Sequence, residues 1–195
     1  MATSVLDMSV SLDGYIAAPN DGPGNPGGDG FTRLHEWGLT EDGTSFRTSG
    51  PAEEQLANIY RTGAVVAGRR TAEQVGHWGG DHHGQGVRIF VPSHRPPGPA
   101  AANYPLVTYV NDGIASAMEQ AKAAAGDRDV LVHGGYTAQR ALAASVLDEI
   151  QIHQVPVLFG SGRRLFDLLP ARVELAIVRV VDTPEATHIR YRVLS

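Results

Sequence analysis

VLVHGGYTAQRAL, residues 130–142, reads as a short strand that turns through two glycines into a helix. Val130–Val132 is the apolar run expected of a buried strand. Gly134 and Gly135 lack Cβ atoms, so a ligand can approach the backbone closely where the chain turns. Helix formers follow, with Thr137 as a candidate cap. The free N–H groups at such a helix start attract phosphate, and the alternative is a tight turn in an α/β fold.

The composition predicts one globular domain over residues 1–195, with a long loop insertion over 19–50. The formal net charge of −5 and the lack of a basic cluster argue against nucleic acid as a partner. There is no cysteine, which excludes a disulfide framework and a thiolate metal site. The first residues show no basic region before a long apolar run, so we expect no signal peptide, no membrane span and a cytoplasmic location.

Apolar runs and turn residues predict alternating strands and helices along the chain. Strand–helix units in series are typical of an α/β fold with a mostly parallel sheet, and the last two strands predict an antiparallel hairpin. Besides the strand and helix of 130–142, the predicted strands are Ser4–Ser11, Ala64–Ala67, Arg88–Pro92, Tyr104–Val110, Ile150–Leu158, Val173–Val181 and Ala186–Leu194. The predicted helices are Pro51–Arg61 (ended by Gly63), one starting over Thr71–Val75, and Ile114–Ala125 (capped by Asn111 or Asp112 and ended by Gly126).

The insertion begins with Pro19–Gly30, PNDGPGNPGGDG, which cannot hold a regular element. A loop of this length in a compact domain is a lid, a binding loop or disordered. Phe31–Trp37 follows as a short helix or an apolar patch on the loop. Trp37 could pack on a ligand, but we favour a surface anchor because Trp is amphipathic.

A second loop, His77–Gly86, reads HWGGDHHGQG and brings three histidines and an aspartate together. A metal site is one interpretation, but the spacing of His77, His82 and His83 fits no pair of ligands on a helix. We therefore expect a flexible polar loop and no bound metal.

Five charged residues have both a structural and a functional interpretation. Asp13 is either a turn residue before Gly14 or a carboxylate facing a substrate. Glu53 and Glu54 either compensate a helix dipole or place an acid at the mouth of a cleft. Arg69 and Arg70 follow a strand and a glycine, where their guanidinium groups either grip phosphate oxygens or are solvated surface charges.

Five motifs follow one another in a fixed order: Ser11–Ile16 (SLDGYI), Gly68–Thr71 (GRRT), Ser93, the pair Gly134–Gly135, and Pro156–Gly162 (PVLFGSG). Together they resemble the dihydrofolate-reductase-like family. More closely, they resemble the branch named for the C-terminal reductase domain of the bifunctional riboflavin-biosynthesis deaminase-reductase. The resemblance covers nearly the whole chain outside the 19–50 insertion.

The resemblance implies an eight-stranded mixed sheet flanked by helices and a binding site for NADPH. Arg69 would bind the adenosine 2′-phosphate, and Ser93 and His94 would flank it. The Gly134–Gly135 peptide would have the unusual form that this family shows. The implied cofactor residues are Ser9 and Ile16 at the nicotinamide; Gly68, Arg69, Arg70 and Thr71 at the phosphates; Ser93 and His94; and Gly134, Gly135, Tyr136, Thr137, Ala138 and Gln139 at the pyrophosphate.

The resemblance also implies the substrate side of the site. Glu53 opens a helix after the lid, as the acid of dihydrofolate reductases does, and is a candidate catalytic residue. Asp13 is a second catalytic candidate, lining the substrate side with Phe159 and Gly160. The longer, glycine-rich lid departs from the family pattern, which disfavours folate as the substrate.

We therefore expect an NADPH-dependent reductase that transfers a hydride to a small heterocyclic or carbonyl substrate. It would be similar to the 5-amino-6-ribosylaminouracil phosphate reductase of the riboflavin pathway. A homodimer is expected by the same resemblance. The alternatives are a non-catalytic nucleotide-binding protein on this fold and an interaction module that uses the long loop as its contact.

Overall fold

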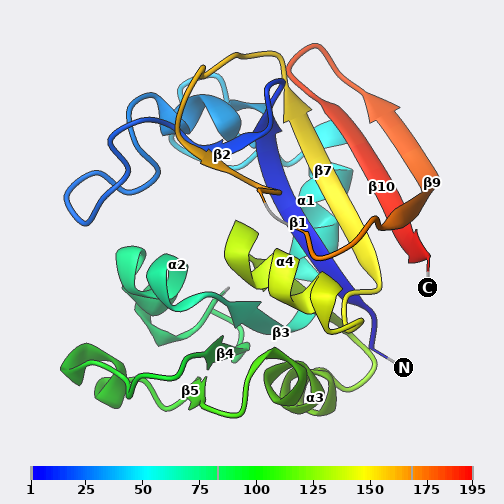
Figure 1. The fold of residues 1–195 in the computed structure, drawn as a ribbon. Helices are drawn as coiled ribbons and strands as arrows, with labels where there is room; N and C mark the ends of the chain where they lie inside the picture. Colours follow the sequence, from blue (N-terminus) through cyan, green and yellow to red (C-terminus); the bar gives the residue numbers. More distant parts are fainter. Residues whose placement is uncertain (1, 83, 168, 195) are drawn as a thin grey trace.

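The computed structural model describes residues 2–82, 84–167 and 169–194. Its main sheet contains β1 (Ser4–Ser11), β3 (Thr62–Ala67), β4 (Arg88–Pro92), β5 (Val107–Val110), β6 (Asp129–His133), β7 (Glu149–Val155), β9 (Glu174–Asp182) and β10 (Thr187–Leu194). The strand order is β5-β4-β3-β6-β1-β7-β10-β9 (Figure 1). The first six strands in this order, from β5 through β4, β3, β6 and β1 to β7, pair in parallel, and β10 pairs antiparallel with both β7 and β9. The predicted mixed sheet with a C-terminal hairpin is confirmed.

The described residues form four α-helices, which cover the two faces of this sheet. They are α1 (Pro51–Tyr60), α2 (Arg69–Gln74), α3 (Ile114–Ala125) and α4 (Gly135–Ala143). Helices α3 and α4 share one apolar cluster with strands β1, β3 and β6, and α1 lies behind the sheet in the view of Figure 1. The 3₁₀ segments are η1 (Phe31–Leu34), η2 (Glu36–Gly38), η3 (Gly76–Gly80) and η4 (Pro99–Asn103). Among the described residues, none of the helices has the length and apolar character needed to cross a membrane.

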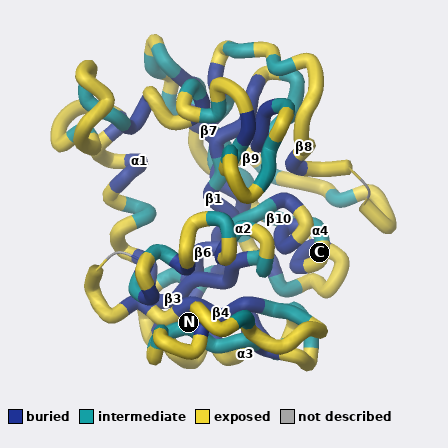
Figure 2. Tube along the Cα trace, turned by 90° about the vertical axis from the view of Figure 1, so that its left-hand side faces the viewer, coloured by how far each residue is buried: buried dark blue, intermediate teal, exposed yellow. Residues whose placement is uncertain are grey.

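The central strands are buried on both faces, as their apolar runs predict (Figure 2). Every residue of β3 is buried, and Leu6, Val66 and Val130 are fully inaccessible to solvent. Each such side chain contributes about 1.5–3 kcal/mol to stability. This rigid centre fixes the carboxyl ends of β1, β3 and β6, where the candidate site lies.

Several predicted element boundaries differ from the structure; for example, the strand predicted over Ile150–Leu158 ends at Val155 in β7, and the helix predicted from Thr71 starts at Arg69. Gly63 does not end α1 but lies in β3, where a Cβ would come within 2.7 Å of the carbonyl oxygen of Ala125. Gly113, with φ +92°, precedes α3 instead of a capping Asn111 or Asp112 side chain. The strand predicted from Tyr104 begins only at β5, because η4 and a turn occupy the preceding residues.

A small two-stranded ribbon stands apart from the main sheet. It pairs β2 (Tyr15–Ala17) antiparallel with β8 (Arg163–Arg164). A Cβ on Gly162 would lie 2.1 Å from the carbonyl oxygen of Ala17, so only glycine fits beside β2. The ribbon packs on the first turn of α4, because a Cβ on Gly135 would lie 3.1 Å from Ile16 Cδ1 and from the Leu165 carbonyl oxygen.

Candidate functional site

Two glycine turns meet at the carboxyl edge of the sheet. β3 and β6 are parallel neighbours in register up to Ala67 and His133, so the turns after them lie side by side. A Cβ on Gly68 would lie 2.6 Å from Thr137 Oγ1, and a Cβ on Gly134 would lie 2.9 Å from Thr71 Oγ1. The structure therefore brings both sequence-predicted phosphate motifs into direct contact.

The start of α4 has the backbone that the glycine pair predicts. Gly134 has φ +95° and precedes the helix, a conformation that residues with a Cβ rarely adopt. The cap is therefore Gly134 and not Thr137, whose side chain is buried against Gly68. Among the described residues no peptide bond is cis, so the unusual feature at this turn is the φ of Gly134.

Other predicted residues of α4 differ in what they can reach. Tyr136 is 75% exposed, whereas the side chain of Ala138 is fully buried in the core and is not available to a ligand. Gln139 Nε2 donates to the carbonyl oxygen of Leu165 at 2.8 Å, which ties α4 to the segment after β8. Ile16 lies next to Gly135.

Arg69 holds the loop that follows β4. Its Nη1 donates to the carbonyl oxygen of Pro96 at 2.8 Å and lies 3.4 Å from Ser93 Oγ, and its Nε pairs with Glu73 at 2.7 Å. The predicted partners of the 2′-phosphate, Arg69 and Ser93, are thus together, and His94 is exposed beside them. Because α2 has only six residues, its contribution to an anion site comes mainly from such side chains.

Arg70 instead faces the insertion. Its Nη2 pairs with Asp21 Oδ2 at 2.9 Å, and Arg163 of β8 approaches the same oxygen at 3.4 Å. The other oxygen of Asp21 accepts from Gln74 Nε2 at 2.9 Å and from Gly27 N–H at 3.0 Å. Burial alone would raise the pKa of Asp21, but these hydrogen bonds and the charge of Arg70 lower it below its ordinary value. Asp21 is therefore a carboxylate at neutral pH.

Asp13 lies with the two residues predicted for the substrate side. Its carboxylate accepts from Ser11 Oγ at 2.5 Å, from Gly160 N–H at 2.7 Å and from Phe159 N–H at 3.2 Å. The Ser11 hydroxyl and these two N–H groups lower the pKa of Asp13. At neutral pH it is ionised and holds the 159–160 loop against β1, so it has no proton to deliver.

The two acids at the start of α1, Glu53 and Glu54, have different surroundings. Glu54 forms a bidentate ion pair with Arg179 of β9, at 2.5 and 2.8 Å, and this hydrogen bonding lowers its pKa. Glu53 is exposed. None of the described contacts joins it to Asp13, so its catalytic role stays a prediction.

Sequence reasoning missed a buried chain of ionisable side chains on the α1 face of the sheet. Asp7 Oδ1 lies 3.0 Å from His153 Nε2, and His153 Nδ1 lies 2.6 Å from His188 Nδ1. The three residues come from neighbouring strands β1, β7 and β10. In the strand predicted over Ile150–Leu158, the alternate residues that include Gln151 and His153 point to a buried face of the sheet. The sequence signal that could have indicated this chain was one histidine in each of two strands with alternating polar and apolar residues.

Trp37 packs against the two histidines of this buried Asp7–His153–His188 group, so the prediction of a surface anchor is wrong. Its side chain is 4% exposed, and its ring lies 4.2 Å from that of His153 and 4.8 Å from that of His188. Its Nε1 donates to Ser9 Oγ at 2.9 Å. The 31–38 part of the insertion is therefore fixed to the sheet beside Ser9, the residue predicted to meet the nicotinamide.

The histidine-rich loop is packed at two of its histidines, which differs from a fully solvated polar loop, whereas residues 84–86 are exposed. His77 is buried with its Nε2 2.9 Å from Tyr109 Oη, and His82 is buried against the Trp78 ring. His83 lies outside the described residues. Within the described ranges, no group of three or more His, Cys, Asp or Glu side chains is arranged to hold a metal ion.

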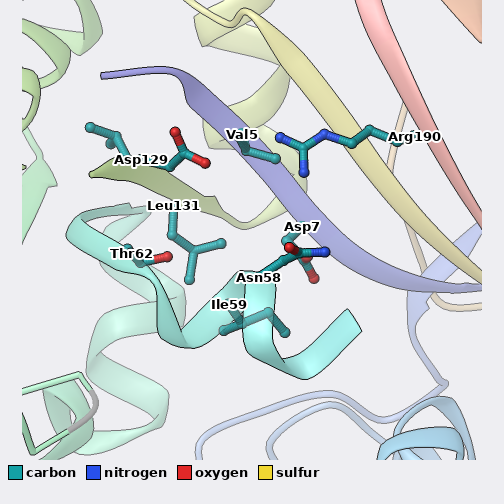
Figure 3. Close-up of a pocket in the computed structure, with 9 residues that line it drawn as sticks. Val5, Asp7, Asn58, Ile59, Thr62, Asp129, Leu131 and Arg190 are labelled. Atoms are coloured by element: carbon teal, nitrogen blue, oxygen red, sulfur yellow. The ribbon is translucent and has the colours of Figure 1, made fainter. Parts of the chain in front are cut away.

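Two hollows lie away from the glycine turns. Figure 3 shows a cleft between α1 and the first residues of β1 and β6, lined by Asp7, Asn58 and Arg190 among others. Its volume of about 10 Å³ suits one water molecule at most. A larger groove of about 270 Å³ lies on the opposite face, between Ile152, Phe166, Leu175 and Tyr191. Neither hollow is lined by the predicted cofactor residues.

Similarity to solved structures identifies the class of fold. A dihydrofolate reductase from Enterococcus faecalis complexed with NADP(H) aligns over 99% of this chain and 97% of its own, with a TM-score of 0.58 and 14% identity. A protein assigned to riboflavin biosynthesis in Shewanella sp. PV-4 aligns over 100% of both chains, with a TM-score of 0.75 and 22% identity. The fold is therefore the dihydrofolate-reductase-like fold.

The particular family follows from the sequence match. The model of the RibD C-terminal domain matches residues 2–189, and the chain belongs to this family. The Thermotoga maritima diaminohydroxyphosphoribosylaminopyrimidine deaminase/5-amino-6-(5-phosphoribosylamino)uracil reductase aligns over 99% of this chain but 57% of its own, with a TM-score of 0.58 and 11% identity. No curated protein matches the chain. Family and fold together support an oxidoreductase of the reductase-domain type.

Proposed function

We propose that this protein is an NADPH-dependent reductase that transfers a hydride to a small heterocyclic or carbonyl substrate, similar to the uracil-phosphate reductase step of riboflavin synthesis. The observation that supports it most is the contact between the Gly68–Thr71 turn, which carries Arg69 and Arg70, and the Gly134–Thr137 turn. Two close-approach turns backed by guanidinium groups suit a pyrophosphate and an additional phosphate. A cytoplasmic location stays an expectation from the sequence.

The residues present fit such a cofactor. Gly134 has no Cβ, so the Thr71 hydroxyl can pack against this turn, and Arg70 already binds an anionic oxygen at this edge in the form of the Asp21 carboxylate. In this proposal Gly68, Thr71 and Gly134–Thr137 hold the pyrophosphate through the backbone, and Arg69 with Ser93 and His94 holds the 2′-phosphate. The Ala138 N–H already donates to the Gly134 carbonyl oxygen at 2.9 Å, so the predicted set ends before Ala138 and Gln139. Ser9 and Ile16 meet the nicotinamide. When bound, NADPH supplies the hydride.

The protein's own share is to orient the substrate and to supply a proton. Asp13 is held as a carboxylate and fixes Phe159 and Gly160 on the substrate side. We assign it a role in orienting substrate through that loop, and we keep Glu53 as the proposed acid. Trp37 closes the interior wall beside Ser9 and excludes water there.

Calorimetric titration with NADPH and NADH tests this function. We expect wild-type protein to bind NADPH more tightly than NADH, and Arg69→Ala to lower the NADPH affinity about tenfold or more while changing the NADH affinity little. Arg140→Ala, a matched change on the later part of α4, is the control. Failure of the wild type to bind either dinucleotide would refute the proposal, and equal losses for both would refute the 2′-phosphate role of Arg69.

We also propose a homodimer that pairs through β9 and β10. β9 is an edge strand of the sheet and carries Leu175, Ile177, Val178 and Val180 as exposed apolar side chains. Leu175 and Ile177 lie opposite Val193 and Tyr191 in the register with β10, so they extend one apolar face. An edge strand with such a face is prone to self-association unless another chain covers it.

A further inference from the structure

A carboxylate of the 19–30 loop, that of Asp21, lies at the proposed phosphate site. Asp21 has a side chain that is 9% exposed, although it lies in the glycine-rich 19–30 loop. Two guanidinium groups, from Arg70 and Arg163, converge on one of its oxygens. Surface loop carboxylates are ordinarily solvated, so this burial indicates a site built for an anion.

This anion site lies beside the two glycine turns. Arg70 is in the first turn of α2, next to Thr71, whose hydroxyl is at Gly134. Arg163 belongs to the β2–β8 ribbon, which packs on Gly135 through the Arg164 carbonyl oxygen. The two arginines therefore flank the paired turns from the α2 side and from the α4 side.

The loop is held together by hydrogen bonds of its own. Its base is closed by Ala18 N–H donating to the Gly27 carbonyl oxygen at 2.8 Å. Inside it, Asp29 accepts from Asn20 at 2.6 Å and from Asn25 at 2.8 Å. Among the described residues, the hydrogen bonds that join this loop to α2 and β8 all end on Asp21. One of these bonds, from Arg70 Nη2 at 3.0 Å, ends on the main-chain carbonyl oxygen of Asp21, and the others end on its carboxylate. Displacing the carboxylate would therefore remove all but one of the bonds to that edge and the bond from Gly27 N–H, while the bonds of Asp29 to Asn20 and Asn25 remain.

We propose that Asp21 occupies a phosphate subsite formed by Arg70, Arg163 and Gln74, so that the 19–30 loop and a phosphate or pyrophosphate group compete for it. The inference rests on the proposed function, because it takes the dinucleotide's pyrophosphate as the competing ligand. A diphosphate offers more acceptor oxygens and more charge than one carboxylate, so it displaces Asp21 when bound. By occupying the subsite in the ligand-free protein, Asp21 lowers the apparent affinity for the cofactor.

The test is calorimetric titration of NADPH, and of inorganic pyrophosphate, into wild type, Asp21→Asn and Asp29→Asn. Asp21→Asn removes the competing charge and should lower the dissociation constant for both ligands about threefold to tenfold. Asp29→Asn is the matched control, because Asp29 lies in the same loop and bonds Asn20 and Asn25 instead of the arginines. It should leave the affinities at the wild-type value.

Hydrogen exchange measured by mass spectrometry gives a second readout. Adding NADPH to wild type should speed exchange over 19–30, where Gly27 N–H donates to Asp21, and Asp21→Asn should show fast exchange without ligand. Unchanged or weaker NADPH binding by a folded Asp21→Asn, with wild type binding normally, would overturn this inference and leave the proposed function standing. Absence of NADPH binding by wild type and Asp21→Asn alike would overturn the proposed function itself.

Discussion

Acidification from pH 8 to pH 5 should cost this protein about 2 kcal/mol of unfolding free energy through His188. The His188 ring is 1% exposed, and burial together with the nearby His153 lowers its pKa from 6.5 to about 4. Asp7, Asp182 and Glu185 oppose this shift without cancelling it. Burial is the larger cause of this lowered pKa, and the electrostatic effect of the His153 ring, whose Nδ1 lies 2.6 Å from His188 Nδ1, adds to it.

The sign follows from which state binds the proton first. In the unfolded chain His188 takes up a proton near pH 6.5, whereas in the folded protein it stays neutral down to about pH 4. Its contribution to stability is therefore complete above pH 6.5 and is lost as the pH falls toward 4. The gap between the two pKa values sets a ceiling of about 3 kcal/mol, of which about 2 kcal/mol is lost at pH 5.

Urea unfolding followed by circular dichroism at pH 8, 6.5 and 5 measures this loss. His188→Asn keeps a polar group near His153 but cannot titrate, so wild type should lose about 2 kcal/mol more than the variant between pH 8 and pH 5. His94→Asn, at an exposed histidine, should follow wild type. Equal losses in wild type and His188→Asn would refute the reasoning, because His188 would then titrate alike in both states.

Two further predictions concern the glycine turn and the edge strand. Gly134→Ala should destabilise the protein by about 1–3 kcal/mol and weaken NADPH binding, because Gly134 has φ +95° and its new Cβ would lie 2.9 Å from Thr71 Oγ1. Gly113→Ala is the control, because Gly113 has φ +92° but no atom within 4 Å of the added Cβ, so this variant has the backbone strain without a steric contact. An equal loss of stability in both variants, measured by thermal unfolding, would show that the contact with Thr71 contributes nothing. Ile177→Asp should convert the proposed dimer to a monomer in light scattering, since Ile177 is 67% exposed on β9. Exposed Leu12→Asp is its control, and an unchanged mass for Ile177→Asp would place the interface elsewhere.

Much of the fold and part of the site could be predicted from local patterns. Ser4–Ser11, Arg88–Pro92 and Ile114–Ala125 have in the structure the same bounds as in the sequence prediction. The two glycine turns were recognisable because a strand that enters a helix needs residues without a Cβ at the turn. Parallel neighbours in an α/β sheet then bring such turns to one edge, which made their meeting predictable.

Contacts between distant segments decided the rest. Trp37 was expected at the surface, and only the tertiary structure shows that it covers His153 and His188. Asp7 and His153 are 146 residues apart and meet through the register of β1 with β7. No local pattern encodes such a register or the partner of a charged side chain.

The sequence by itself determined most of the main strands and helices and the two glycine turns, because these depend on short-range sterics and on the periodic burial of apolar side chains. The tertiary structure alone decided that Gly63 lies in a strand, that the Asp7–His153–His188 chain is buried, and that Asp21 faces Arg70 and Arg163. The physical reason is that charge pairing and desolvation depend on which segments the closed fold brings together.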